Sequence, residues 1–410
     1  MSEWKKVKLG EVCKRVTSGG TPKANVSSYY NPPTIPWLKT KEVNYCRITK
    51  TENYISEEGL NNSSAKLIAP NSVIIAMYGQ GDTAGRVAIN KIPLTTNQAC
   101  CNLTIDETKA NYEYVYYQLC TLYSKMVSLK AGAAQPNLNA QIIKNLEISL
   151  PPLNVQINIA TVLSRYDTLI ENYQRQIELL EEAAQRLYKE WFIDLNFPGY
   201  ESTKVVDSVP EGWERKKIGD LISKTQRTKQ VPTNCYQSVG SIPIIDQSKN
   251  YIAGYTDDKE CKVSVEIPYI VFGDHTRVLK FIPFSFAKGA DGTQLIMTND
   301  LKRMPQSLFY NSLKHVDLSN YSYARHFKYL KEEQILVPTE LIADRYDSFA
   351  SKWYKAIRQC RKEINILTEA RDRLLPKLMS GEISVETAQY VTSGLGVCKE
   401  QTDSQKATDS

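Results

Sequence analysis

A heptad pattern between Leu163 and Leu187 constrains this chain more than any other feature. Apolar residues recur there at alternating steps of three and four, the a/d spacing of a coiled-coil seam. The eight seam residues are Leu163, Tyr166, Ile170, Tyr173, Ile177, Leu180, Ala184 and Leu187. Because the residues between them are mostly polar, we expect this helix to pack along one narrow stripe against a single partner helix.

The same chain contains a matching helix. At an offset of 187 residues, seven of the eight seam positions are again apolar. The matching residues are Ala350, Trp353, Ile357, Cys360, Ile364, Leu367, Arg371 and Leu374. The string Leu180-x-Glu182-Ala183-x-x-Arg186-Leu187 returns as Leu367-x-Glu369-Ala370-x-x-Arg373-Leu374. Two matching helices, each after a large segment, indicate an internal repeat.

The repeat extends into the segments that precede the helices. Residues 4–12 resemble residues 213–221 at an offset of 209, and the prolines at 151–152 match Pro338 at an offset of about 187. The second globular segment is therefore shorter than the first by 22 residues.

A further likeness joins residues 165–167 and 345–347, which both read Arg-Tyr-Asp. Its offset is 180, one heptad out of register with the other matches. We interpret it as coincidence.

The chain is expected to be an α+β protein with two mixed α/β globules and two long helices. The expected boundaries are a first globule at 1–152, a first helix at 153–197, a second globule at 198–338, a second helix at 339–383, and a polar, disordered tail at 384–410.

Local patterns predict the elements inside these parts. The first globule should contain strands at 71–78, 86–89 and 148–150, and helices at 112–129 and 138–144. The second should contain strands at 267–272, 280–286 and 335–337, and a helix at 323–331. Asn154 should cap the first long helix, which would reach about Phe192. The second should run from about Glu340 to Met379, with Pro376 as a kink and Gly381 as its stop.

Composition excludes several classes of protein. No run approaches the roughly 18 apolar residues that a membrane helix needs, and the opening Met-Ser-Glu-Trp lacks the apolar core of an export signal. The nine cysteines form no Cys-x-x-Cys pair, and there are only three histidines. We therefore expect a cytoplasmic protein with reduced thiols and no metal site.

Charge weakly favours a nucleic-acid partner. The net charge is +6, and the globular segments are basic while residues 151–199 are acidic. Many metabolic enzymes share such a modest basic excess, so charge alone decides little.

Two short strings favour a methyltransferase at first sight. Residues 31–34 (Asn-Pro-Pro-Thr) lack the aromatic residue that would stack on a flipped base. Residues 78–81 (Tyr-Gly-Gln-Gly) lead into a strand-like run, whereas a cofactor-binding glycine turn should open a helix. There is also no phosphate-binding Gly-x-x-x-x-Gly-Lys-Ser/Thr loop and no nuclease-like carboxylate cluster, so we expect no catalytic residues.

Glycine-rich loops between expected strands are the better candidates for function. The loop at 79–86 ends in Arg86, and the loops at 273–277 and 288–294 lie in similar strand-turn-strand settings. Arg, Lys, Gln, Asn, Ser and Thr are the side chains that read base edges or bind phosphates. The alternative for each loop is a hairpin turn with an exposed polar side chain.

Taken together, these features resemble the specificity subunit of a Type I restriction–modification enzyme. The resemblance rests on the paired openings at 4–12 and 210–221, and on Gly-Ala-Ala-Gln-Pro-Asn-Leu at 132–138 with Leu-Glu-Ile-Ser-Leu-Pro-Pro at 146–152. It also rests on Tyr-Lys-Glu-Trp-Phe at 188–192 and on the ending at 371–383. The second globule departs from the pattern, since residues 323–328 replace the Gln-Pro-Asn loop.

The resemblance implies that each globule is a target-recognition domain for one half of a split, asymmetric DNA site. The long helices would pack antiparallel and act as a spacer of roughly 50–60 Å, about one and a half turns of B-DNA. The candidate DNA-contacting residues are Lys23, Gln80, Thr83, Arg86, Gln135, Asn137, Gln247, His275, Thr276, Arg277, Lys288, Arg325 and Lys328.

The resemblance also implies the partners. Two methylation subunits and two restriction–translocation subunits would join this chain on double-stranded DNA. S-adenosylmethionine, ATP and Mg²⁺ would bind those partner subunits, and this chain would bind no cofactor itself. Two alternatives stay open: a stand-alone adenine DNA methyltransferase, and a coiled-coil adaptor that never contacts DNA.

Overall fold

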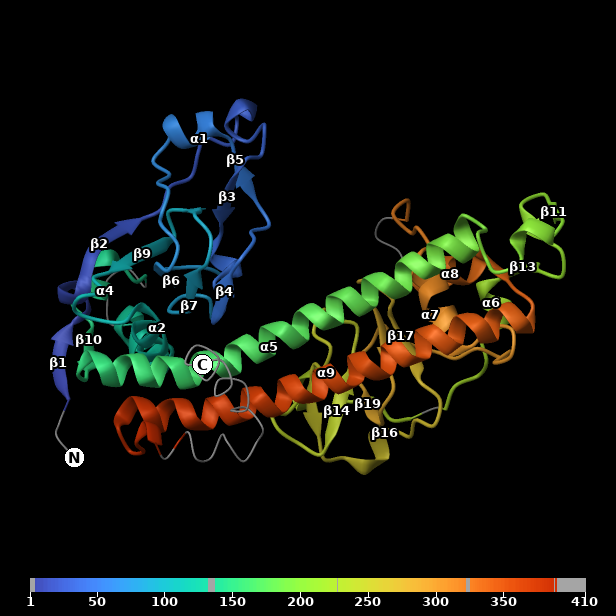
Figure 1. Ribbon diagram of the computed structural model, residues 1–410. Coiled ribbons are helices and arrows are strands. Elements are labelled where there is room, and N and C mark those ends of the chain that lie inside the picture. The colour runs from blue at the N-terminus through green and yellow to red at the C-terminus, as the bar shows by residue number, and fades with distance from the viewer. Residues whose placement is uncertain (1–3, 132–136, 227, 322–324, 387, 389–410) are drawn as a thin grey trace, which may run out of the picture. The chain divides into compact units, whose positions relative to one another are not determined.

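The computed structural model describes residues 4–131, 137–226, 228–321, 325–386 and 388 (Figure 1). The chain forms two compact units, which we call unit 1 (residues 1–171 and 365–410) and unit 2 (residues 172–364). The boundary between the units falls inside both long helices, α5 (Leu153–Tyr188) and α9 (Glu340–Ser380). None of the helices in the described part of the chain combines the length and apolar character needed to cross a bilayer.

Unit 1 is built on a five-stranded sheet. In spatial order its strands are β2 (Cys13–Ser18), β9 (Cys100–Ile105), β6 (Val73–Ala76), β7 (Val87–Asn90) and β4 (Cys46–Ile48). A smaller sheet contains β5 (Tyr54–Ile55), β3 (Ile35–Leu38) and β8 (Thr95–Thr96), and β1 (Lys5–Lys8) pairs with β10 (Glu147–Leu150). Its shorter helices are α1 (Glu57–Asn61), α2 (Tyr112–Thr121), α3 (Tyr123–Ala131) and α4 (Ala140–Lys144). Every residue of β6 and β7 is buried, as expected for central strands with apolar side chains on both faces.

Unit 2 contains two sheets that pack against helices. One sheet has the order β15 (Gly254–Thr256), β14 (Ile242–Ile245), β19 (Phe286–Lys288) and β16 (Lys262–Val263). The other has the order β18 (Leu279–Ile282), β17 (Tyr269–Gly273) and β20 (Thr293–Ile296). Two strand pairs join β13 (Glu214–Lys217) to β21 (Gln334–Val337) and β11 (Val205–Val206) to β12 (Val209–Pro210). The shorter helices are α6 (Ile218–Leu221), α7 (Gln306–Lys314) and α8 (His326–Glu332), and a π-helical turn (Lys189–Ile193) follows α5.

The internal repeat predicted from the sequence is present in both units. In unit 1, β1 and β10 pair antiparallel with Lys5 opposite Leu150. In unit 2, β13 and β21 pair in the same way with Glu214 opposite Val337. These residues are related by the offsets of 209 and 187 that the sequence predicts, so each globule is closed by an equivalent pair of strands.

A pair of glycines shows the same repeat at atomic detail. A Cβ atom added to Gly10 would lie 3.2 Å from the Cβ of Lys144, and one added to Gly219 would lie 3.1 Å from the carbonyl oxygen of Lys331. Each glycine therefore lets the turn after the first strand pack closely on the short helix α4 or α8. The two lysines are also 187 residues apart.

The aspartates of the two Arg-Tyr-Asp strings have similar contacts, although the strings stay one heptad out of register with the other matches of the repeat. The Asp167 carboxylate accepts a hydrogen bond from the Tyr117 hydroxyl of α2 at 2.5 Å. The Asp347 carboxylate accepts one from the Ser307 hydroxyl of α7. A shift of one heptad keeps a residue on the same face of a helix, and in each unit this aspartate attaches a globular helix to a long helix.

Three predicted elements differ from the structure. The helix expected at 112–129 is divided at Leu122, which ends α2. The strand expected at 280–286 forms two strands in different sheets, since Pro283 lies between them and cannot donate to a ladder. Asn154 lies inside α5 and does not cap it, because the Pro152 carbonyl already accepts the amide hydrogens of Val155 and Gln156.

The bounds predicted for the second long helix agree with α9, which contains Pro376. Gly381 follows it with a φ of +73°, the left-handed conformation that commonly ends helices.

All residues of the two predicted seams are buried or half-buried. In unit 2, Gln176 of α5 contacts Cys360 of α9, and the Tyr346 hydroxyl donates to the Ala184 carbonyl at 3.2 Å. Residue numbers rise along α5 while they fall along α9, so the two helices are antiparallel in this unit. A continuous coiled coil over their whole length stays a prediction.

Aromatic and aliphatic residues of α5 and α9 complete the core of unit 2. Tyr346 and Ala350 of α9 and Ala184 of α5 are fully buried in the same apolar cluster as Phe309 of α7 and Ile270 of β17. Parts of α5 and α9 thus belong to the same apolar core as the sheet of β17. This shared core explains why the compact unit includes part of each long helix.

In unit 1 the helices are joined by a charged network. Arg371, the one polar residue in the second predicted seam, forms an ion pair with Asp167 at 2.6 Å between Nη1 and Oδ1. Both side chains are mostly buried, at 20% and 11% exposure. Burial, and then the Asp167 carboxylate, raises the pKa of Tyr117 well above its usual range, so Tyr117 remains a donor to Asp167. The positive charge of Arg371 in the seam is therefore neutralised by neighbouring carboxylates, those of Asp167 and Asp372.

We predict that Asp167→Asn destabilises unit 1 by about 2 kcal/mol or more, because Arg371 would then be left in a mostly buried site without its main partner. Glu369→Gln is the matched control, since it also removes one carboxylate from an ion pair of α9, but that pair with Arg373 is exposed. The free energies of unfolding should be measured by urea denaturation. Equal values for the two variants would contradict the role given to Asp167.

Candidate nucleic-acid interface

The glycine-rich loop of unit 1 connects β6 to β7 and is held by its own polar residues. The Gly85 amide donates to the Ala76 carbonyl at 2.8 Å, which closes the base of the loop. Arg86 pairs with Asp82 at 2.6 Å, and its Nη1 donates to the Asn44 side chain at 2.9 Å. Arg86 is thus positioned by two partners, and its side chain retains 22% exposure.

The other two predicted residues of this loop differ in their exposure and in their hydrogen bonds. Gln80 is exposed, while the Thr83 hydroxyl donates to the Gln80 carbonyl at 2.7 Å. Thr83 therefore has a hydrogen bond inside the loop, and Gln80 offers its side-chain amide to solvent.

A second predicted loop of unit 1 meets the first. The Leu138 amide donates to the Met77 carbonyl at 3.1 Å, so the exposed Asn137 lies beside the start of the glycine-rich loop. Asn139 then caps α4 through the Ile142 amide at 2.9 Å. Gln135 lies outside the described residues.

Lys23 belongs to a different part of unit 1. It is exposed in the segment between β2 and β3, where the Tyr30 hydroxyl donates to the Pro22 carbonyl at 2.8 Å. Among the described residues, no hydrogen bond or ion pair connects this segment to the glycine-rich loop, so the structure does not bring Lys23 together with Arg86.

In unit 2 the predicted residues form a compact cluster around Gln247. The Gln247 side chain donates to the Asp291 carbonyl at 2.9 Å and accepts from the His275 amide at 3.1 Å. The Thr276 hydroxyl donates to the Gln247 carbonyl at 2.6 Å. Three loops that are far apart in the sequence therefore meet at one amide side chain.

Buried Asp274 attaches a fourth segment to this cluster. Its carboxylate accepts from the Phe327 amide at 2.8 Å, and its carbonyl accepts from the His326 amide at 3.0 Å. Both ring nitrogens of buried His326 lie 2.8 Å from carbonyl oxygens, those of Asp274 and Tyr321. The start of α8 is consequently fixed beside the loop at 274–277.

The basic residues predicted in unit 2 lie on these same segments. Arg277 has a φ of +59° and donates to the Leu318 carbonyl at 3.1 Å. Lys288 is half-buried, and burial lowers its pKa. Arg325 and Lys328 are exposed at the start of α8. Four cationic residues therefore lie on or next to the segments that meet at the Gln247 cluster.

The two loop clusters occupy equivalent places in the repeat. In unit 1 the residue after β6, Met77, accepts from the segment that leads into α4. In unit 2 the residue after β17, Asp274, accepts from the segment that leads into α8. Each unit thus presents an arginine-bearing loop and the entrance of a short helix side by side.

Sequence reasoning missed the residues that organise these clusters. Asp82 carries a detectable signal, because an acid four residues before Arg86 can pair with it in a tight turn. Asp274 directly follows the apolar strand β17, which marks it as an acid at a strand end. Asn44 has no signal in the sequence, since it reaches Arg86 only through the fold.

A cluster of metal-binding side chains is absent from the part of the chain that the structure describes. No group of three His, Cys, Asp or Glu side chains there could hold a metal ion. Burial raises the pKa of Cys13 and Cys101 to about 12, so both remain protonated thiols. The glycine-rich loop leads directly into β7 and opens no helix, unlike a cofactor-binding turn.

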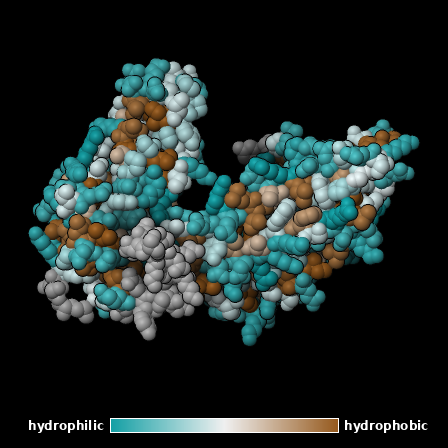
Figure 2. Space-filling model, viewed as in Figure 1, coloured by the Kyte–Doolittle hydropathy of each residue, from teal (hydrophilic) through white to brown (hydrophobic). Residues whose placement is uncertain are grey.

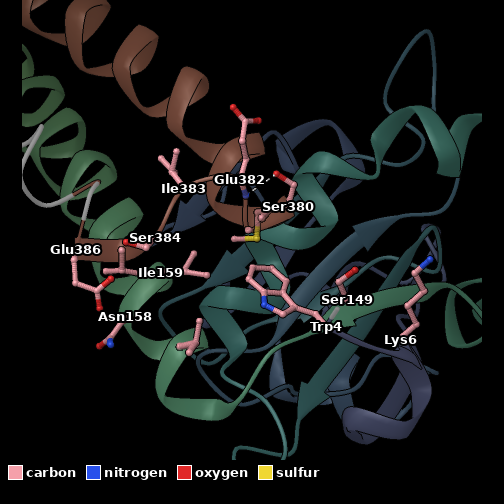
Figure 3. A pocket seen from close by; sticks show the side chains of 14 residues that line it. Trp4, Lys6, Ser149, Asn158, Ile159, Ser380, Glu382, Ile383, Ser384 and Glu386 are labelled. Atoms are coloured by element: carbon pink, nitrogen blue, oxygen red, sulfur yellow. Dashed lines mark hydrogen bonds between the residues drawn. The ribbon is translucent and has the colours of Figure 1, made fainter. Parts of the chain in front are cut away.

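A cavity of about 670 Å³ lies in unit 1 (Figure 3). It is lined by Trp4, Ser149, Ile159 and the turn that follows α9. The equivalent tryptophan of unit 2, Trp213, is covered by Phe197, with ring centroids 4.7 Å apart. The two repeats therefore differ at this position, and none of the predicted DNA-contacting residues lines the cavity.

We predict that Gly292→Ala disrupts the Gln247 cluster. Gly292 has a φ of +84°, and a Cβ atom there would lie 2.5 Å from the Gln247 side-chain nitrogen. The Gln247 side-chain amide would have to move and lose its hydrogen bonds, which costs about 1 kcal/mol. The strain of an alanine at positive φ adds to this cost. Gly199→Ala is the control, since Gly199 has a similar φ of +93° and open space around it. Thermal denaturation of both variants should show the larger loss for Gly292→Ala, and equal losses would contradict the proposed cluster.

Comparison with known proteins identifies similar sequences and a similar fold. Residues 1–182 match the family model described as the Type I restriction modification DNA specificity domain. The chain is 28% identical to the Type I restriction enzyme MjaIX specificity subunit of Methanocaldococcus jannaschii, with 93% of each chain covered. It is 29% identical to the EcoR124I/EcoR124II specificity subunit of Escherichia coli, with 48% of each chain covered.

Among solved structures, the chain is similar to the S subunit of a Type I restriction–modification system from M. genitalium. The TM-score is 0.57 at 15% sequence identity, with 92% of this chain and 96% of that chain covered. This likeness concerns the fold, whereas the family model and the sequence relatives concern the family. Residues 1–182 thus match the Type I restriction modification DNA specificity domain, and the whole chain is similar in sequence to a specificity subunit of a Type I restriction enzyme.

Proposed function

We propose that each unit of this specificity subunit reads one half of a split, asymmetric DNA site. The observation that carries the proposal is the equivalent placement of two arginine-bearing loops, one after β6 and one after β17. The loops are alike in position and different in sequence, which suits two readers of different half-sites. Arg86 and Arg277 would contact guanine edges or phosphates, and the amides of Gln80 and Gln247 would contact adenine or the backbone.

Arg86 is suited to specific recognition because its conformation is already set. Its contacts with Asp82 and Asn44 reduce the conformational entropy that binding would otherwise remove. Arg277 is exposed and has one carbonyl partner. The remaining predicted residues of unit 2 (His275, Thr276, Lys288, Arg325 and Lys328) would supply phosphate contacts around it.

The partners belong to the same proposal. Specificity subunits of this family work in complexes with modification subunits, restriction subunits and DNA, and we propose two copies of each enzyme subunit per chain. The long helices would be their docking surface. Figure 2 shows apolar side chains on the part of unit 2 where α5 and α9 run next to each other. On these two helices Leu179, Leu341 and Phe349 are at least 47% exposed, which supports a partner surface.

Cofactor chemistry would lie with those partners. S-adenosylmethionine, ATP and Mg²⁺ would bind the modification and restriction subunits, and the complex would act on DNA in the cytoplasm. The purified chain, incubated with labelled S-adenosylmethionine and DNA, should transfer no methyl group. Methyl transfer by the chain alone would contradict the proposal and favour a stand-alone adenine methyltransferase.

We predict that Arg86→Ala and Arg277→Ala each weaken recognition of one half-site only. The loss of one good base contact costs about 1–3 kcal/mol, so binding to the intact site should fall roughly 10-fold or more. Competition by DNA in which one half-site is scrambled assigns each arginine to its half. Arg373→Ala is the control, because Arg373 lies on an exposed face of α9. If neither loop variant changed binding, a coiled-coil adaptor that never contacts DNA would be the better interpretation.

We also propose that α5 and α9 set the spacing between the half-sites. Inserting one heptad between Ile170 and Ile177, with a matched heptad between Ile364 and Asn365, lengthens both helices and preserves the seam pattern. The half-sites should move apart by roughly 10 Å, or about three base pairs, with both half-site sequences unchanged. Methylated adenines, mapped by single-molecule sequencing of host DNA, report the new spacing. An unchanged spacer length in that map would argue against the ruler.

A further inference from the structure

A second pocket, about 220 Å³ in volume, lies in unit 2 between the sheet of β17 and β18, α7 and α9. It is small compared with the pockets that hold drug-sized ligands. Five cationic side chains and a single carboxylate line it. These are Lys249, Lys280, Lys314, Arg358, Arg361 and Glu181. The excess of positive charge is unusual for a cavity that is lined otherwise by apolar and tyrosine side chains.

Only part of this positive charge is neutralised. Arg361 pairs with Glu181 at 3.2 Å, and its guanidinium lies 3.6 Å from the centre of the Tyr251 ring. Among the described residues, Lys249 and Arg358 form no hydrogen bond or ion pair. Both are exposed at the pocket and are free to contact a ligand.

Two further lysines of the pocket, buried Lys280 and exposed Lys314, carry their charge at a cost. Burial lowers the pKa of Lys280 and of Lys314, and nearby Asp246 and Glu181 counteract this only in part. Lys280 is 4% exposed. A bound anion would stabilise the charged form of both ammonium groups, so the pocket is electrostatically prepared for a negative ligand.

The pocket is connected to the candidate recognition site through one loop. The Lys280 ammonium donates to the carbonyls of Asp246 and Asn250, and thereby holds the loop at 246–250. That loop carries Gln247, which organises the recognition cluster, and Lys249, which lines the pocket. The pocket therefore lies on the flank of the loops that would read a half-site.

We propose that this pocket binds a phosphate group, supplied by the DNA backbone beside the half-site that unit 2 reads. The proposal rests on the DNA-reading function proposed above. A phosphate presents several oxygens in different directions, which suits the Arg358 guanidinium and the Lys249 and Lys314 ammonium groups, which come from separate elements. Lys280 and Arg361 are held by Asp246, Asn250 and Glu181 and would add positive charge at the site. The phosphate group could belong to the DNA backbone or to inorganic phosphate in solution. Both are tetrahedral oxyanions, and only the first is part of a polymer. The test separates the two sources.

The test uses the full-length chain and the double variant Lys249→Gln/Arg358→Gln. Neither residue has a structural partner among the described residues, so we expect this variant to fold. Lys352→Gln/Lys362→Gln is the matched control, because it removes two exposed positive charges from α9 outside the pocket. The first measurement is thermal stability during titration with inorganic phosphate, compared with chloride at equal ionic strength. The second is the dependence of DNA affinity on salt concentration.

We expect phosphate to raise the melting temperature of the wild-type chain and the control more than chloride does, and this gain to disappear in the double variant. For DNA, the affinity falls as the salt concentration rises. The magnitude of the slope of log affinity against log salt should be smaller by about 1 in the double variant, as expected for one lost phosphate contact. A lost phosphate response with an unchanged DNA slope would assign the pocket to free phosphate. An unchanged phosphate response in the double variant would overturn the proposal. Because the phosphate titration contains no DNA, its result does not depend on the DNA-reading function.

Discussion

The packing of α5 against α9 within each unit is the constraint on which the rest of the structure depends. In each unit a segment of α5 contacts a segment of α9, through Asp167 and Arg371 in unit 1 and through Ala184 and Tyr346 in unit 2. The globules then dock on these helices through aspartates with similar contacts. Since the compact units each include parts of both helices, the helices are components of the cores and cannot be regarded as simple linkers.

The repeat explains how one chain can present two similar but separate binding surfaces. Strand pairing at the base of each globule keeps the same register in both copies, and a glycine in each copy permits close packing of the following turn. The loops at the far ends of β6 and β17 are free of that requirement and differ in length and sequence. Conserved packing at one end and variable loops at the other is the arrangement expected of a protein that reads two different sequences.

Positive charge in unit 2 is organised at two levels. The Gln247 cluster fixes the loops by neutral hydrogen bonds, with cationic residues around it. The adjacent pocket gathers five cations, of which Lys280 is buried, Arg361 is half-buried and the other three are exposed. Lys280 links the two levels, because its ammonium group holds the loop that carries Gln247.

The sequence alone was sufficient for the features that depend on periodicity and local chemistry. The heptad seam, the repeat with its offsets, the bounds of α9 and the stop at Gly381 could be predicted because each is encoded in neighbouring residues. The family resemblance also followed from motifs in their order along the chain. The break at Leu122 and the division of the strand around Pro283 were missed, since these boundaries depend on contacts with other elements.

The tertiary structure decided which polar residues act together. Gln247 and Asp274 gather loops from distant parts of the sequence, and Asn44 reaches Arg86 across 42 residues. The pocket beside them is formed by five elements with no common motif. Burial and charge pairing between distant segments leave no periodic trace in a chain, so sequence identified the candidate loops and only the fold assembled them into sites.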